Sequence, residues 1–236
     1  MNLKTVLLII VSAAVCLTAV ELTVVTEDWR PYNYQEYGIV KGLSTDIVRQ
    51  VLDHSGITYE INVFPWSRSY KMALEDKNVL IYTLIRIEPR EKLFKWVRPL
   101  GKGGQTSLYR LTAKSKINPK ALQDVKKYQL AANENSMDHL WLKYNGFDNV
   151  STPPQVENTI RMLFAGRIDM IPFDDSVIES EFTHFGFKTA DVVKVLPLFK
   201  TPPYMALSLN TPDSILIKLQ KAYDELLKSH KIKLVN

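Results

Sequence analysis

The stretch LIYTLIRIEPREKLFKWVRPL, from Leu80 to Leu100, begins as an apolar run and ends in charge. The apolar residues are typical of a strand that is buried in a sheet. At the end of this strand the chain places two arginines and two acids, Arg86, Glu88, Arg90 and Glu91. Arginine is the side chain best suited to hold a planar anion, because its guanidinium group offers parallel donors. The stretch therefore predicts an anion site where the strand leaves the core.

The length and composition of the chain indicate one large folded domain or two lobes. It has 236 residues, of which 46% are hydrophobic, and a formal net charge of +5. The lysines and arginines are spread among acids, so we expect no nucleic-acid partner. The four histidines lack metal-ligand spacing and no G-x-S-x-G motif is present, so we expect no metal, no cofactor and no catalysis. We expect a monomer.

The first residues, MNLKTVLLIIVSAAVCLTAV, read as a secretory signal peptide over residues 1–20. One lysine precedes an apolar run that is short for a membrane span of about 20 residues, although a single membrane anchor is the alternative. Cys16, the only cysteine, lies within this segment, so the exported chain would contain no thiol. Removal of Lys4 lowers the net charge by one, from +5 to about +4. These features predict cleavage and a periplasmic location.

Strand and helix patterns alternate after residue 21. The segment ELTVVTEDW reads as a strand, GLSTDIVRQVLDHSG as a helix with Ser44 or Thr45 as its N-cap, and TYEINVF as a second strand. A second alternating series runs from YQLAAN to the long amphipathic helix TPDSILIKLQKAYDELLKSHK. The order predicts an α/β fold of two lobes, each with a mostly parallel sheet flanked by helices and with a ligand cleft between the lobes.

Six pieces of the chain occur in an order that resembles a known family. They are TEDWRPYNY, GLSTDIVRQVL, FPWSRSYKMAL, RIEPREKLFKWVRPL, GRIDMIPFDDSV and YMALSLNTPD. The chain resembles the extracellular solute-binding proteins of family 3, the periplasmic amino-acid-binding components of ABC transporters with the type II periplasmic binding fold. The resemblance implies a first lobe of residues 21–101 and 205–236, a second lobe of residues 106–198, and hinge crossings at residues 102–105 and 199–204.

The resemblance also implies a set of ligand-binding residues. Arg90 would grip the carboxylate of the ligand and Asp174 its ammonium group. Thr83 would add a hydroxyl or backbone contact, and Asn135 and Ser136 would bind the carboxylate at the start of a helix. Trp29 and Trp66 would cover the apolar part of the ligand. Arg86 stands where many relatives have a small or apolar residue, so it is either a second anion contact or the partner of a surface acid.

Simpler interpretations of these residues remain open at this point. Arg90 could pair with Glu88 or Glu91 on the surface, and both tryptophans could belong to the core. Asp174 competes with Asp175, since either acid could cap a helix. The segment GKGGQTS is similar to a phosphate loop, but its lysine precedes the last glycines, so we interpret it as a hinge.

The sequence thus predicts a periplasmic protein that closes two lobes around a small solute with a carboxylate, an amino acid or a related compound, for an ABC-type uptake transporter. Its partner would be a membrane permease or, alternatively, a membrane sensor. A second alternative is a dehydratase-like enzyme of the same fold, for which Glu27, Asp28 and Asp175 are the candidate acids or bases.

Overall fold

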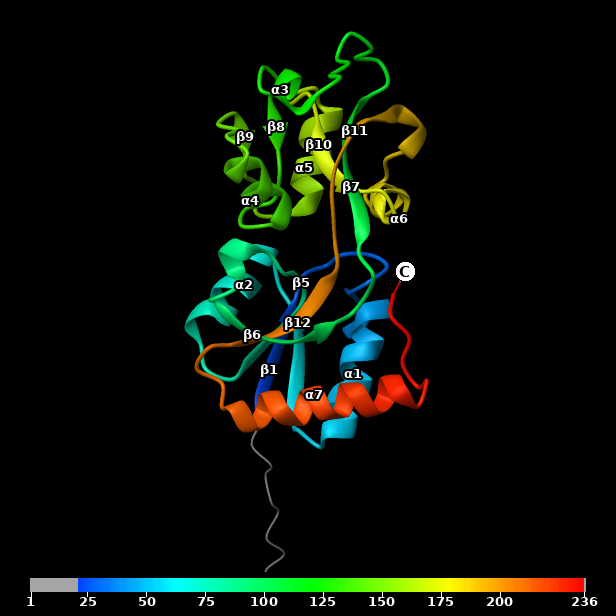
Figure 1. The fold of residues 1–236 in the computed structure, drawn as a ribbon. Helices are drawn as coiled ribbons and strands as arrows, with labels where there is room; N and C mark the ends of the chain where they lie inside the picture. The colour runs from blue at the N-terminus through cyan, green and yellow to red at the C-terminus, as the bar shows by residue number, and fades with distance from the viewer. Residues whose placement is uncertain (1–20, 236) are drawn as a thin grey trace, which may run out of the picture.

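The computed structural model describes residues 21–235, which form two lobes stacked one above the other in Figure 1. The signal peptide expected over residues 1–20 lies outside this range. In chain order the elements are β1 (Leu22–Thr26), β2 (Tyr34–Glu36), β3 (Ile39–Lys41), α1 (Leu43–Ser55), β4 (Tyr59–Val63), α2 (Trp66–Glu75), β5 (Val79–Ile85), η1 (Glu88–Arg90), β6 (Phe94–Pro99), β7 (Gly104–Leu111), α3 (Leu122–Val125), β8 (Leu130–Ala131), α4 (Met137–Tyr144), β9 (Val150–Ser151), α5 (Val156–Phe164), β10 (Ile171–Asp174), α6 (Ile178–His184), η2 (Thr189–Asp191), β11 (Val192–Thr201), β12 (Pro203–Ser208) and α7 (Asp213–Lys228).

The first lobe, the lower one in Figure 1, is built on a five-stranded sheet in the order β4-β1-β5-β12-β6. Successive side chains of a strand point to opposite faces, and the two faces of β1 are both apolar. Val24 packs into a core shared with α1 and α7, whereas Val25 packs against α2. Strands β1 and β5 are therefore covered on both faces, as their continuous apolar sequences predict.

Helix α1 begins differently from the sequence prediction. Its N-cap is Gly42, with a φ of 126°, and neither Ser44 nor Thr45 caps it. Both are buried, and the Thr45 hydroxyl lies 2.8 Å from that of Tyr82. Gly42 is required here because a Cβ atom at this position would overlap the backbone of Tyr32.

The second lobe, the upper one in Figure 1, has a three-stranded sheet in the order β10-β7-β11 and a short parallel pair, β8 and β9. Its apolar residues form two clusters, one around α5, α6 and β10, and the other around α4, β8 and Leu108 of β7. The three-stranded sheet is antiparallel throughout.

The α/β class is confirmed, but the expectation of a mostly parallel sheet in each lobe is wrong in detail. Among the described strands of the first-lobe sheet, parallel pairing is confined to β1 with β4 and β5, since β12 runs antiparallel to β5 and β6. The physical reason is the connection between the lobes. The chain enters the second lobe along β7 and returns along β11, so these two strands run in opposite directions and pair over most of their length.

The two lobes are joined where β6 leads into β7 and where β11 leads into β12 (Figure 1). The end of the described chain returns to this point, since Val235 pairs with Gly101 and accepts a hydrogen bond from the amide of Lys102. The lobe boundaries and the two hinge crossings that the resemblance implies stay a prediction. Among the described residues, no helix is long and apolar enough to cross a membrane.

Candidate functional site

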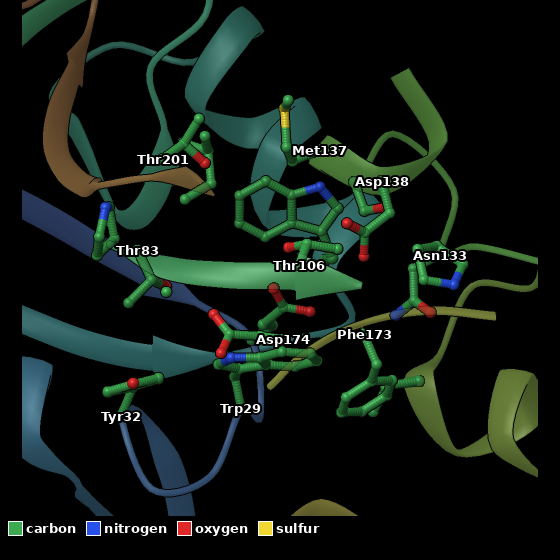
Figure 2. Close-up of a pocket in the computed structure, with 18 of the residues that line it drawn as sticks. Trp29, Tyr32, Thr83, Thr106, Asn133, Met137, Asp138, Phe173, Asp174 and Thr201 are labelled. Carbon is green, nitrogen blue, oxygen red and sulfur yellow. The ribbon is translucent and has the colours of Figure 1, made fainter. Parts of the chain in front are cut away.

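A cavity of about 130 Å³ lies between the lobes, and side chains of both lobes line it (Figure 2). Its wall is rich in aromatic rings, among them Trp29, Tyr32, Trp66, Phe173 and Phe199. The charged side chains in its lining are Glu27, Arg90, Asp138 and Asp174. A cavity with a mainly apolar wall and a few converging polar groups is typical of a small-molecule site.

Arg90 ends the short helix η1 that follows β5, and only 1% of the residue is exposed. Its guanidinium group donates to the backbone oxygen of Ile85 over 3.1 Å and to that of Asn135 over 2.7 Å. Its Nε atom is buried without a hydrogen-bond partner among the residues described. Arg90 is therefore a buried cation in the cavity wall, and it does not pair with Glu88 or Glu91.

Asn135 and Ser136 precede α4, and they differ in role. Ser136 lines the cavity and caps the helix, because its Oγ atom accepts a hydrogen bond from the amide of His139 over 3.1 Å. Asn135 has a φ of 57° and is not among the residues that line the cavity. Its carbonyl oxygen accepts from Arg90 and, over 2.8 Å, from Nε1 of Trp66. The two residues of the first lobe thus hold one backbone oxygen of the second.

The two tryptophans both line the cavity, and their contact with a ligand stays a prediction. Trp29 stacks on Phe173 of the second lobe with a ring-centroid distance of 5.2 Å, and Figure 2 shows the two rings on the same side of the cavity. Trp66 is 3% exposed and stacks on Tyr70 at 5.8 Å. Each ring is therefore packed by a neighbour and presents only part of its surface to the cavity.

Thr83 lies at a bulge in β5, where the pairing with β12 shifts by one residue. Its φ is 60°, an uncommon backbone conformation for a β-branched residue. The bulge brings Thr83 to the cavity wall, and its Oγ1 atom donates to the backbone oxygen of Tyr82 over 2.6 Å. Strained conformations of this kind gather at functional sites, where the surrounding structure holds them.

The structure distinguishes Asp174 from Asp175. Asp174, at the end of β10, lines the cavity, and its Oδ1 atom accepts a hydrogen bond from the amide of Ser176 over 2.8 Å. Burial raises the pKa of Asp174, although the hydrogen bonds from Ser176 act in the opposite direction. Asp175 instead pairs with Lys194 at 2.9 Å and accepts from the Tyr109 hydroxyl.

Arg86 lies outside the cavity lining. Its Nε atom donates to Glu91 over 2.9 Å, and its guanidinium group lies over the rings of Trp96 and Tyr204. The structure therefore places Arg86 beside a surface acid and apart from the other residues predicted for the site.

Two acids of the cavity were not predicted as ligand contacts. Glu27 follows β1 directly, and the rule that ligands gather at the carboxyl ends of strands points to it, although the sequence suggests it only as a candidate acid or base. Asp138 is the second residue of α4, and no sequence signal distinguishes it from an acid that favours a helix start. Asp28, another of the three candidate acids, lies 3.8 Å from Nε of Arg30.

Contacts between the lobes close the site around the cavity. The Tyr32 hydroxyl lies 2.9 Å from the hydroxyl of Ser176. The amide of Arg30 donates to Glu181 of α6, and the Ser180 hydroxyl donates to the Arg30 carbonyl over 3.1 Å. The loop after β1 is therefore seated on the second lobe, and the molecule has a closed form.

Solved structures that are distant in sequence share this arrangement. A histidine kinase sensor domain with similarity to periplasmic binding proteins is 16% identical, with a TM-score of 0.76 over 89% of this chain and 91% of the other. A variant of ArgBP from T. maritima is 18% identical, with a TM-score of 0.75 over 89% and 90%. The arginine-, lysine-, histidine-binding protein ArtJ from Geobacillus stearothermophilus is 14% identical, with a TM-score of 0.75 over 89% and 91%.

These identities establish a common fold and nothing narrower. A comparison with curated proteins found no significant match. The sequence model of the bacterial extracellular solute-binding proteins, family 3, matches residues 22–233, which is nearly all of the chain outside the first 21 residues. The protein therefore belongs to family 3 of the bacterial extracellular solute-binding proteins.

Proposed function

We propose that the protein captures an amino acid or a related small carboxylate outside the cytoplasm, by closing its lobes, and delivers it to an ABC-type uptake transporter. The observation that supports this best is that Arg90 and Asp174 both line the cavity between the lobes. Arg90 belongs to the first lobe and Asp174 to the second. A zwitterion that spans them would bind its carboxylate on one lobe and its ammonium group on the other.

The residues that line the cavity support a small solute with both a negative and a positive group. The solved structures with the same fold include proteins named for the binding of arginine, lysine and histidine. The buried Nε atom of Arg90, which has no partner in the described chain, is a donor that a carboxylate can satisfy. Asp174 keeps one carboxylate oxygen free of the hydrogen bonds to Ser176.

The first experiment is a thermal-shift screen of the protein against amino acids and dicarboxylates, followed by calorimetry of each hit. A solute at 100 times its dissociation constant adds about 2.7 kcal/mol to the free energy of unfolding. Arg90→Ala should weaken binding by at least about 100-fold, since it removes charge-assisted hydrogen bonds worth about 1.5–3 kcal/mol each. Arg90→Lys, which keeps the charge but loses the planar fork, should also bind weakly.

The matched control is Arg98→Ala, which removes an arginine of the same lobe that pairs with Asp224 at 2.7 Å outside the cavity. This variant should keep the affinity of the unchanged protein. Melting curves of all variants show whether each is folded. A folded Arg90→Ala variant that binds with normal affinity would refute the proposed role of Arg90.

The second candidate function is that of a sensor module. It is favoured by the likeness to the histidine kinase sensor domain, which has the same fold over 89% of this chain. Deletion of the gene distinguishes the two functions. Delivery predicts lost uptake of the labelled solute, whereas sensing predicts normal uptake and a lost response of the cell to the solute.

A further inference from the structure

The first turn of α4 contains a histidine to which the proposed function gives no role. His139 is the third residue of the helix, and its amide donates to Oγ of Ser136, the N-cap, over 3.1 Å. Its imidazole turns back over the helix start, where Nδ1 accepts a hydrogen bond from the amide of Asn135 over 3.0 Å. In a capping box the acceptor at this helix position is a glutamate or glutamine side chain. Here the acceptor is an imidazole, which can gain a proton near neutral pH.

The residue that His139 holds is also the one to which the first lobe binds. The carbonyl oxygen of Asn135 accepts from the guanidinium group of Arg90 over 2.7 Å and from Nε1 of Trp66 over 2.8 Å. Figure 1 shows α4 above α2, the helix that begins with Trp66. Asn135 is therefore held through its amide by the second lobe and through its carbonyl by the first.

The backbone of Asn135 depends on this support. Its φ of 57° lies in the left-handed region, which is unfavourable for residues other than glycine, although asparagine tolerates it better than most. The dihedral angles of a residue fix the direction of its carbonyl relative to its amide. If Asn135 leaves this conformation, its carbonyl turns away from the donors of Arg90 and Trp66.

A proton on Nδ1 would remove the bond from His139 to Asn135. In the neutral ring Nδ1 accepts, so the hydrogen is on Nε2; in the imidazolium ion both nitrogens are donors. The Nδ1 hydrogen would then face the hydrogen of the Asn135 amide. Burial lowers the pKa of His139, and the charge of Lys143 one turn further along α4 adds to this, while Glu134 in the preceding loop opposes it. The closed form therefore favours the neutral ring.

Other titratable and charged groups lie near this turn. Arg90, from the first lobe, binds the carbonyl of the residue whose amide His139 accepts, so it opposes a further positive charge there. Asp138, the neighbour of His139 in α4, lines the cavity. Burial and the charge of Asp174 raise the pKa of Asp138 to about 7, against Arg90. Because these acids also titrate, a test must separate His139 from them.

We propose that His139 is a positioning residue that makes closure of the lobes depend on a neutral imidazole. At neutral pH Nδ1 holds Asn135 with its carbonyl toward Arg90 and Trp66, and the lobes close. At acidic pH the protonated ring releases Asn135 and the closed form weakens. The inference rests on lobe closure in the proposed function, and it adds a condition under which a captured solute is released.

The test follows the bond between the lobes through the indole signal of Trp66 in the nuclear magnetic resonance spectrum of ¹⁵N-labelled protein. Trp66→Phe identifies that signal. The probe is an equimolar mixture of the twenty standard amino acids, and its half-saturating concentration is measured at pH 7.5 and pH 5.5. This concentration should rise about 3- to 10-fold at pH 5.5, because a solvated imidazole with a pKa of about 6.5 is protonated there and closure must expel the proton.

Two substitutions of His139 separate the acceptor from the charge. His139→Asn places an amide oxygen about where Nδ1 lies, so it keeps an acceptor for the Asn135 amide and does not titrate. Its half-saturating concentration should change at least about 3-fold less between the two pH values than that of the unchanged protein. His139→Ala removes the acceptor, so it should need about 3- to 10-fold more of the mixture at pH 7.5.

The matched control is His54→Asn. His54 is an exposed histidine of α1 that pairs with Glu225 at 2.8 Å, outside the cavity lining. This variant should keep the pH dependence of the unchanged protein. The acids of the cavity titrate in every variant, so the comparison uses the difference between each variant and the unchanged protein. The ring ¹⁵N signals of His139 should show hydrogen on Nε2 at pH 7.5, and hydrogen on Nδ1 would overturn the proposal.

The outcomes separate this inference from the proposed function. If the unchanged protein and His139→Asn respond equally to pH, the inference is overturned and capture of the solute stands. If the mixture leaves the Trp66 signal unchanged at both pH values, the proposed capture of an amino acid fails. The protein without solute then decides the inference: loss of the bond at pH 5.5 in the unchanged protein but not in His139→Asn supports it, and any other result overturns it.

Discussion

Glu181 of α6 provides a quantitative test of the closed interface between the lobes. The residue is 0% exposed, one oxygen accepts a hydrogen bond from the amide of Arg30, and Oε2 is buried without a partner in the described structure. Burial raises the pKa of Glu181 to about 8 from an ordinary value of 4.5, and the charge of Asp28 adds to this, while the Arg30 amide and side chain oppose it. Between about pH 4.5 and pH 8, Glu181 therefore keeps a proton in the native protein that it releases in the unfolded chain.

The size of the effect follows from the two pKa values. Below pH 4.5 both states hold the proton and the contribution of Glu181 to stability is fully present; as the pH rises from there to about 8, it is lost. The loss amounts to about 1.36 kcal/mol per pH unit in this window. Between about pH 5.5 and 7.5 the unchanged protein should lose up to about 2.7 kcal/mol through this residue, and Glu181→Gln, whose amide does not titrate, should not.

The assay is urea denaturation, followed by tryptophan fluorescence, at the two pH values. Acids that do not interact with Glu181 titrate equally in both proteins, so their contributions cancel in the difference between the variant and the unchanged protein. The charge of Glu181 raises the pKa of Glu27, so both proteins are compared with Glu27→Gln also present. That difference should shift in favour of Glu181→Gln at the higher pH, whereas the control Glu179→Gln, which removes an exposed acid of the same helix, should show no such shift. An equal difference at both pH values would refute the interpretation that Glu181 is buried and protonated in the closed form.

Two further substitutions test the closure of the site. Trp66→Phe keeps an aromatic ring but removes the Nε1 donor to the Asn135 carbonyl. The affinity for the tightest-binding solute, measured by calorimetry, should fall about 5- to 10-fold, which corresponds to the roughly 1 kcal/mol of an ordinary hydrogen bond. An unchanged affinity would show that this bond does not stabilise closure. Gly104→Ala would place a Cβ atom where the Asp174 carboxylate lies, so it should displace Asp174. Binding should weaken at least about 10-fold, while the circular dichroism spectrum of the protein stays unchanged. Normal binding would show that the position of Asp174 is unimportant for the solute.

Much of the first lobe could be predicted from the sequence because its signals are local. The apolar run before Ile85 predicts β5, and the change of hydrophobic period after Gly42 predicts α1. The position of Arg90 could also be predicted, because the family register extends directly from the strand before it. What the sequence did not indicate is that Arg90 is buried, since its partner atom on Asn135 lies 45 residues further along the chain.

The features that the sequence failed to predict depend on contacts between distant segments. The antiparallel direction of β7 and β11 is set by their passage between the lobes, and the hydrophobic pattern of each strand contains no information about it. Asp138 is an ordinary first-turn acid in the sequence, and only the folded structure shows that it lines the same cavity as Glu27 of the other lobe. The positive φ of Thr83 likewise depends on the bulge in the pairing with β12.

Arg90 connects the proposed recognition of the solute with the closing of the lobes. Its guanidinium group is anchored to its own lobe through the Ile85 carbonyl and reaches the other lobe through the Asn135 carbonyl. A carboxylate bound to the remaining donors would hold the Arg90 guanidinium group in one orientation. The side chain would then lose its conformational entropy when the solute binds, and closure of the lobes would not cost that entropy a second time. With a solute that lacks the carboxylate, the hydrogen bond to Asn135 alone would have to offset the entropy that Arg90 loses on closure. The free energy that separates the open from the closed form should therefore depend on the anionic end of the solute, even though the atoms that join the lobes here belong to the protein alone.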